Sequence, residues 1–126
     1  VRLPGRFQVV PGEPEWILDV AHNEPAAAVL AANLRARPSR GRTLAVVGIL
    51  ADKDVAAIGR LLAPCIDEWI LCGLEGPRAL SAPQLRERLL PHAATATLTP
   101  DVAAACSHAR AVAGPADRVV VLGSFH

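Results

Sequence analysis

The stretch Thr43-Leu44-Ala45-Val46-Val47-Gly48-Ile49 decides the fold, because it is a continuous apolar run of strand length. A strand that is buried on both faces reads in this way, whereas a strand with one solvated face alternates apolar and polar residues. The polar turn Ala51-Asp52-Lys53-Asp54 follows, and an apolar helical pattern then runs from Val55 to about Ala63, with Asp54 placed as its N-cap. This strand-turn-helix unit indicates a parallel sheet.

The same unit recurs on both sides of this stretch. Further strands are predicted at residues 6–10, 16–20, 68–71, 95–98 and 118–123, and further helices at 24–37, 81–90 and 101–113. Because parallel neighbours need a crossover, this alternation predicts an α/β domain with a mostly parallel sheet of about six strands and helices on both faces. The Pro-Gly-Glu-Pro turn at 11–14 leaves the first two strands as either a hairpin or a flanking edge strand.

Capping residues mark the beginnings of the predicted helices. Asn23 is placed as the N-cap of helix 24–37, and Ser81 and Gln84 have capping-box spacing at the start of helix 81–90. In helix 24–37 the helical period places Ala26, Val29, Leu30 and Leu34 on one face.

Composition narrows the class of protein. A chain of 126 residues, 52% of them hydrophobic, is enough for one domain with a core. A net charge of +1 with scattered arginines argues against nucleic acid or an anionic membrane as a partner, and no apolar run approaches the roughly 20 residues of a membrane span. The cysteines Cys65, Cys72 and Cys106 are odd in number and lack CxxC spacing, so we expect reduced thiols, no metal site and a cytoplasmic protein.

Ligands of parallel α/β sheets bind beyond the carboxyl ends of the strands, and this rule selects the loop Asp19-Val20-Ala21-His22-Asn23 first. A carboxylate there can accept hydrogen bonds from ribose hydroxyls, a neutral imidazole can bind a substrate near neutral pH, and the following helix N-terminus favours anions. The alternative is that Asn23 only caps the helix and His22 lies in a loop whose hydrogen bonds are satisfied.

Other candidate residues follow strand ends or precede a strand. Lys53, the only lysine of the chain, lies in a turn that is otherwise explained by capping, and Ser124 follows a glycine that allows a ligand close to the backbone. Arg6 can bind a phosphate or a carboxylate through its guanidinium, or lie on the surface. Ser124, His22 and Asp19 also suggest a hydrolase, but no GxSxG motif surrounds the serine. The sequence has no GxxxxGK[ST] phosphate-binding loop.

A set of motifs carries a family resemblance. Taken in order and spacing, the segments 3–7 (LPGRF), 16–23 (WILDVAHN), 48–54 (GILADKD), 74–78 (LEGPR) and 123–126 (GSFH) resemble bacterial folylpolyglutamate synthase/dihydrofolate synthase, a family of the Mur ligase superfamily. The resemblance covers essentially the whole chain. It implies that residues 1–126 form a Rossmann-like, three-layer carboxy-terminal glutamate-ligase domain, and that an amino-terminal P-loop ATPase domain is absent from this chain.

The resemblance implies an ATP-dependent acid–amino-acid ligase that adds L-glutamate to dihydropteroate or to folate polyglutamates through an acyl phosphate. By this resemblance Arg6 contacts the phosphates and Asp19 the ribose of ATP, His22 and Ser124 contact L-glutamate, and Lys53 lies near the glutamate site. His22 is the only candidate catalytic residue. Mg²⁺ accompanies ATP and is held mainly by the amino-terminal domain, so the isolated domain is expected to be inactive. The expected partners are these small molecules and that domain, and the expected state is a monomer.

The chain departs from the family pattern at two places. Glu24 follows the Ala-His-Asn motif where the family has proline, so that proline moves to Pro25 and a negative charge is added near the anion site. The family also continues beyond His126, and this chain contains no methionine, so we expect it to be a piece of a longer protein. The alternatives are another Mur-type ligase, of peptidoglycan precursors or of cyanophycin, and a non-catalytic α/β binding module.

Overall fold

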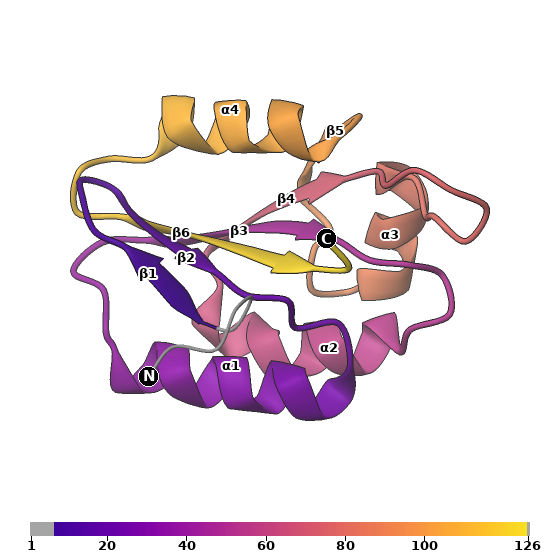
Figure 1. Cartoon of the computed structure of the whole chain (residues 1–126), viewed down its shortest axis with the longest axis horizontal. Helices are drawn as coiled ribbons and strands as arrows, with labels where there is room; N and C mark the ends of the chain where they lie inside the picture. Colours follow the sequence, from indigo (N-terminus) through magenta and orange to yellow (C-terminus); the bar gives the residue numbers. More distant parts are fainter. Residues whose placement is uncertain (1–6, 126) are drawn as a thin grey trace.

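A six-stranded sheet forms the centre of the computed structural model, which describes residues 7–125 (Figure 1). Its strands are β1 (Gln8–Val10), β2 (Glu15–Leu18), β3 (Thr43–Gly48), β4 (Glu68–Cys72), β5 (Thr97–Thr99) and β6 (Arg118–Gly123). They lie in the order β1-β2-β6-β3-β4-β5; β1 pairs with β2 in antiparallel fashion and every other pair is parallel. The mostly parallel α/β sheet is thereby confirmed, and the first two strands form a hairpin.

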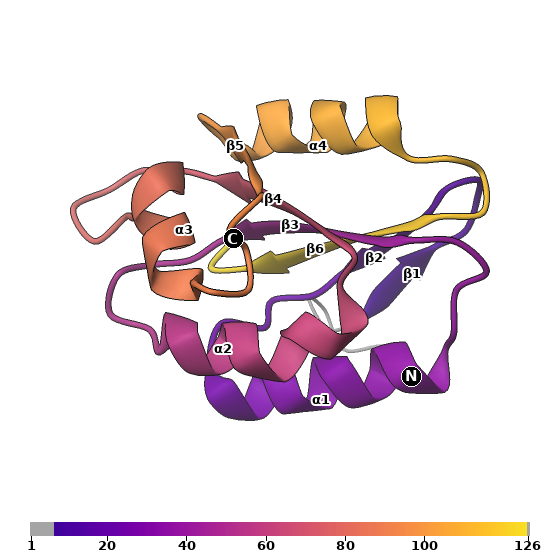
Figure 2. The same ribbon diagram turned by 180° about the vertical axis from the view of Figure 1, so that it is seen from behind.

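Helices cover the two faces of this sheet. One face carries α1 (Glu24–Ala36), α2 (Val55–Leu62), the short 3₁₀ turn η1 (Ala63–Cys65) and α3 (Ala82–Leu89), and the other carries α4 (Val102–Val112). Figures 1 and 2 show α1 and α2 side by side below the sheet and α4 above it. The predicted three-layer arrangement is confirmed.

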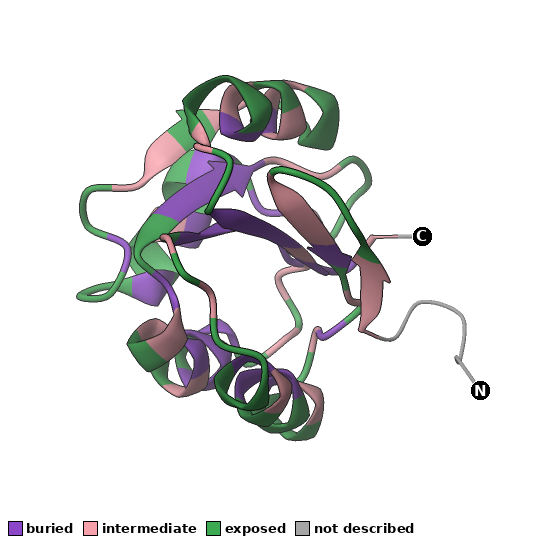
Figure 3. Ribbon diagram, turned by 90° about the vertical axis from the view of Figure 1, so that its left-hand side faces the viewer, coloured by how far each residue is buried: buried purple, intermediate pink, exposed green. Residues whose placement is uncertain are grey.

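Strand β3 is buried along its whole length, as its apolar run predicts. Leu44 and Val46 pack toward α4, whereas Ala45 and Val47 pack into the larger core beneath α1 and α2. Figure 3 shows the buried residues concentrated in the central strands, with the β1–β2 hairpin at the less buried edge. Because each buried aliphatic side chain contributes about 1.5–3 kcal/mol, the central strands and the buried faces of the helices together stabilise the domain.

The helices α1, α2 and α3 begin at the predicted caps, and α4 begins at Asp101, whose capping role was not predicted. In each case a cap side chain accepts a hydrogen bond from a backbone N–H three residues on: Asn23 from Ala26 (2.9 Å), Asp54 from Ala57 (3.2 Å), Ser81 from Gln84 (3.3 Å) and Asp101 from Ala104 (2.8 Å). The side chain of Gln84 in turn accepts a bond from the N–H of Ser81, which completes the predicted capping box. Predicted element ends coincide with the observed ends or differ from them by at most two residues.

The apolar face of α1 that the sequence indicates coincides only in part with the face that is buried. Its buried residues are Ala27, Leu30, Ala31 and Leu34, whereas Ala26 is half-buried and Val29 is 60% exposed. Both sets have helical spacing, but the helix packs against the sheet and α2 through the stripe that contains the two small alanines. The neighbouring stripe with Val29 lies beside the hairpin instead.

Asp117 fixes the connection into β6 at the edge opposite the predicted site. Its carboxylate accepts hydrogen bonds from the backbone N–H groups of Gly114 and Arg42, both at 2.7 Å, and from the Arg42 guanidinium at 2.9 Å. The bond from Gly114 and those from Arg42 hold the pKa of Asp117 below its ordinary value of 3.8. The charged form is therefore favoured by folding.

We expect Asp117→Asn to lower the free energy of unfolding by about 1 kcal/mol near neutral pH, because it weakens bonds to a charged acceptor. A carboxylate whose pKa is lowered by folding contributes its full stability above its unfolded pKa and loses it as the pH falls through the folded pKa. The difference between variant and wild type should thus be constant above about pH 5 and shrink below about pH 4. Urea unfolding across this range measures it, with the exposed Glu87→Gln on α3 as control. An undiminished difference at about pH 3 contradicts this account.

Candidate functional site

The loops at the carboxyl ends of the parallel strands form one rim of the domain. Residues 19–23 follow β2, residues 124–125 follow β6, residues 49–54 follow β3 and residues 73–81 follow β4. The loops that the sequence indicated as ligand-binding therefore lie together at the carboxyl edge of the sheet, within the part of the chain that the structure describes.

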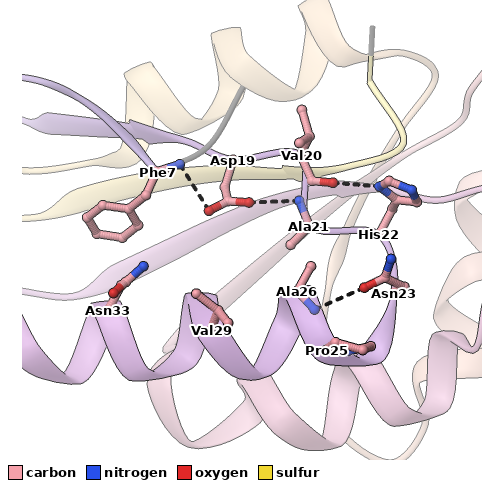
Figure 4. Close-up of a pocket in the computed structure, with 10 residues that line it drawn as sticks. All are labelled: Phe7, Asp19, Val20, Ala21, His22, Asn23, Pro25, Ala26, Val29 and Asn33. Atoms are coloured by element: carbon pink, nitrogen blue, oxygen red, sulfur yellow. Dashed lines mark hydrogen bonds between the residues drawn. The ribbon is translucent and has the colours of Figure 1, made fainter. Parts of the chain in front are cut away.

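A cavity of about 510 Å³ opens between the β1–β2 hairpin and the first turns of α1 (Figure 4). Apolar side chains form most of its wall, and Asp19 is the only acidic residue among those that line it. The lining residues are Phe7, Asp19, Val20, Ala21, His22, Asn23, Pro25, Ala26, Val29 and Asn33.

Asp19 is held firmly at the end of β2. Its Oδ2 accepts a hydrogen bond from the N–H of Phe7 at 3.2 Å, and its Oδ1 accepts one from the N–H of Ala21 at 2.8 Å. Its own N–H donates to the carbonyl of Val121 in β6 at 2.9 Å. The carboxylate is therefore oriented by backbone from two different segments before any ligand binds.

His22 lies on the same cavity, half-buried, with Nδ1 2.6 Å from the carbonyl oxygen of Val20. A carbonyl oxygen only accepts, so Nδ1 carries the hydrogen of this bond, and in the neutral ring Nε2 is then an acceptor. The geometry assigns Nε2 as the ring atom that is available to a ligand.

Glu24, the departure from the family pattern, does not line the larger cavity. It is the first residue of α1, and its carboxylate lies 3.3 Å from the guanidinium of Arg60 on α2. Both side chains are exposed, so the pair contributes little to stability. It does, however, compensate the added negative charge beside the α1 N-terminus.

Ser124 occupies a different part of the rim from His22. Its N–H donates to the carbonyl of Gly48 at 2.8 Å, and its hydroxyl accepts from the N–H of Leu50 at 3.2 Å. It lines a second cavity, of about 380 Å³, together with Leu50, Leu74, Glu75, Gly76, Pro77, Arg78 and Phe125. The structure thus places Asp19 and His22 on one cavity and Ser124 on another, beyond the ends of the neighbouring strands β2 and β6.

Lys53 and Arg6 are the remaining predicted site residues. Lys53 is half-buried on the loop after β3, and its ammonium forms no hydrogen bond or ion pair within residues 7–125. It lines neither of these two cavities. Arg6 lies outside the described residues.

Sequence reasoning missed several residues of the rim. Phe7, Val29 and Asn33 line the larger cavity, and Arg78 lines the smaller one. The position of Val29 on a second apolar stripe of α1 was a usable signal for an apolar wall. Arg78 belongs to the LEGPR motif that carried the family resemblance, but its contact with the loop after β3 joins residues far apart in sequence and was not predicted.

Cys72 and Cys106 do not contribute nucleophiles to this rim. All three cysteines are free, and burial raises the pKa of Cys72 to about 12 and also raises the pKa of Cys106. These two thiols stay protonated near neutral pH. Within residues 7–125 no group of three or more His, Cys, Asp and Glu side chains is arranged to hold a metal ion. The same residues contain no helix that is long and apolar enough to cross a membrane.

The carboxyl rim of this parallel α/β sheet thus carries an Asp-x-x-His-Asn loop after β2 and a Gly-Ser loop after β6. The family model for the Mur ligase glutamate ligase domain matches residues 5–125, and the chain belongs to this family.

Within that family the chain is similar to enzymes of folate metabolism. It is 45% identical over 124 residues to dihydrofolate synthase/folylpolyglutamate synthase of Escherichia coli strain K12, covering 98% of this chain and 28% of that protein. The solved structure of E. coli FolC with DHPP and ADP has a TM-score of 0.91 at 45% identity, covering 98% of this chain and 29% of that one.

A bifunctional folylpolyglutamate synthase/dihydrofolate synthase with Mn, AMPPNP and L-glutamate bound has a TM-score of 0.88 at 47% identity. The similarity covers 99% of this chain and 30% of that one. The chain thus spans less than a third of the length of these relatives.

Proposed function

We propose that this chain is the carboxy-terminal, glutamate-ligase domain of an ATP-dependent amide ligase that adds L-glutamate to dihydropteroate, to folate polyglutamates or to both. The observation that carries the proposal is the larger cavity, where an oriented carboxylate, Asp19, and an imidazole acceptor, His22, lie beside the N-terminus of α1. Its support is the likeness to proteins whose structures hold ADP with DHPP, or AMPPNP with L-glutamate.

The reaction of such a ligase has two steps. The acceptor carboxylate takes the γ-phosphoryl group of ATP to give an acyl phosphate and ADP. The amino group of L-glutamate then attacks the acyl carbon, and phosphate leaves from the tetrahedral intermediate to give the amide. Positioning and charge stabilisation supply most of the rate enhancement in phosphoryl and acyl transfer of this kind.

The residues of the larger cavity fit the nucleoside part of ATP. The Asp19 carboxylate can accept hydrogen bonds from ribose hydroxyls, and Phe7 and Val29 offer an apolar wall to a base. We assign ribose contact to Asp19 and phosphate contact to Arg6.

For L-glutamate we assign contacts to His22 and Ser124, with Lys53 as a neighbouring cation. His22 is the candidate for accepting a proton from the amino group, because its Nε2 is the free acceptor of the ring. His22 and Ser124 line different cavities but follow the neighbouring strands β2 and β6, so an amino acid that contacts both lies across the ends of these two strands.

The rest of the machinery belongs to the remainder of the protein. Mg²⁺ bound with ATP neutralises developing phosphate charge, and we assign its ligands and the phosphate-binding loop to an amino-terminal P-loop domain. Catalysis then requires the two domains to close on ATP. We also propose that the protein acts as a monomer in the cytoplasm.

Phosphate release tests this function. The 126-residue chain should release no phosphate from ATP with dihydropteroate or folate and L-glutamate, whereas the longer protein should do so only when both substrates are present. Turnover by the pure chain would contradict the division of labour between domains. Activity with a UDP-linked acceptor and none with pteroates would transfer the assignment to a peptidoglycan-type ligase, and a longer protein without any such activity would favour a binding module.

A further inference from the structure

The loop after β3 is held by the segment that follows β4 rather than by its own turn alone. Leu50 forms an isolated antiparallel bridge with Ala79, and the N–H of Ala51 donates to the carbonyl of Arg78 at 2.7 Å. The guanidinium of Arg88, on α3, donates to the carbonyl of Ala51 at 2.6 Å. The backbone of this loop is therefore fixed relative to β4 and α3.

In this loop, which follows β3, the two acidic side chains have hydrogen-bond partners, whereas the lysine side chain between them does not within residues 7–125. Asp52 accepts a hydrogen bond from the Arg78 guanidinium at 2.7 Å, and Asp54 accepts one from the N–H of Ala57 as the cap of α2. Lys53 stands between these acids, yet its ammonium has no partner within residues 7–125. Since opposite charges on adjacent residues attract, the capture of Asp52 by Arg78 leaves the ammonium available to another anion.

We propose that Arg78 is a positioning residue that acts through Asp52 to keep the Lys53 ammonium available to a carboxylate of the amino-acid substrate. Arg78 and Ser124 line the same cavity, and the Ser124 hydroxyl holds the N–H of Leu50, so both residues set the same loop. The identity of the amino acid rests on the proposed function, whereas the division of charge in the loop does not.

The kinetic test uses the full-length protein and a double-mutant comparison. Arg78→Ala should raise KM for L-glutamate about three- to fivefold with little change in kcat, a modest effect because the ion pair is exposed. Asp52→Asn alone should stay within about twofold of wild type, and adding it to Arg78→Ala should return KM to that range, because the acid that captures Lys53 is gone. A purely structural ion pair predicts the opposite, namely equal damage from either single change and no rescue.

A second readout does not depend on turnover. Lys53 is the only lysine, so reductive methylation with ¹³C-formaldehyde labels only this side chain and the chain's α-amino group, and it preserves the positive charge. Arg78→Ala should move the Lys53 methyl signal of the 126-residue chain and reduce its response to added L-glutamate, and Asp52→Asn should reverse both changes. Arg40→Ala, at the opposite edge of the sheet, is the matched control and should leave the signal unchanged.

These two readouts separate the inference from the proposed function. If Arg78→Ala shifts the labelled Lys53 signal and Asp52→Asn restores it, but the protein forms no glutamyl amide, the role of Arg78 is supported and the proposed reaction is wrong. If the protein is a ligase as proposed but Arg78→Ala changes neither the Lys53 signal nor KM for L-glutamate, the role of Arg78 is wrong. The same conclusion follows if Asp52→Asn does not reverse the defect of Arg78→Ala.

Discussion

Replacing Gly123 by alanine is expected to lower the free energy of unfolding of this chain by about 2–5 kcal/mol, because two penalties add. Gly123 has a φ of +130°, a conformation that residues with a side chain rarely adopt. A Cβ at this position would lie 2.0 Å from the carbonyl oxygen of Gly48, its partner across the β3–β6 pair. Relieving this clash must separate the two strands at the rim, which also breaks the bond from Ser124 to Gly48. Urea unfolding measures the loss.

Two other glycines serve as controls for the two penalties. Gly76 has a φ of +108°, but no atom lies within 4 Å of the place that an alanine Cβ would occupy, so Gly76→Ala carries only the backbone cost, about 1 kcal/mol. Gly114 has neither a positive φ nor a close contact, since its nearest atom lies at 3.5 Å, and Gly114→Ala should change stability by less than about 1 kcal/mol. If Gly123→Ala costs no more than Gly76→Ala, the close approach of β3 and β6 is not a determinant of stability.

Much of this fold was readable from local signals. The apolar run at Thr43–Ile49 predicted a strand buried on both faces, and the caps Asn23, Asp54 and Ser81 predicted where helices begin, because both signals act within a few residues. The buried face of α1 was not readable, since two adjacent stripes are both apolar and only packing against α2 and the sheet selects between them. The order of the strands likewise depends on contacts between distant segments.

The candidate site was likewise predictable from the sequence only in part. The sheet rule brought Asp19, His22, Lys53 and Ser124 to one rim, because parallel strands end at a common edge. It did not predict that Phe7 orients Asp19, or that His22 and Ser124 lie on different cavities. These are distances between side chains on separate loops, and each depends on the conformation of a loop rather than on its position in the sequence.

In the full-length protein, Asp19→Asn is expected to raise KM for ATP about 10- to 100-fold, since hydrogen bonds to a charged group contribute about 1.5–3 kcal/mol and each 1.4 kcal/mol is a factor of ten. The amide loses the negative charge and turns one acceptor into a donor. Because Phe7 and Ala21 each donate an N–H to this side chain, the amide NH₂ also faces one of these donors and disturbs the cavity wall. Initial rates over a range of ATP concentrations measure the change. Thermal unfolding of the same variant shows whether the loop remains folded.

Asp101→Asn is the matched control, because this carboxylate caps α4 at the far end of the same rim and should leave KM for ATP unchanged. A KM for ATP within about twofold of wild type in Asp19→Asn would remove the nucleotide from the larger cavity. The effect of His22→Ala then shows which of the two ligands reaches the imidazole. If His22→Ala raises KM for L-glutamate, the amino acid reaches from the Ser124 cavity to the imidazole; if it raises KM for ATP instead, the larger cavity serves the nucleotide alone. In that second case the glutamate contacts have to come from Ser124, Lys53 and the loop that Arg78 holds.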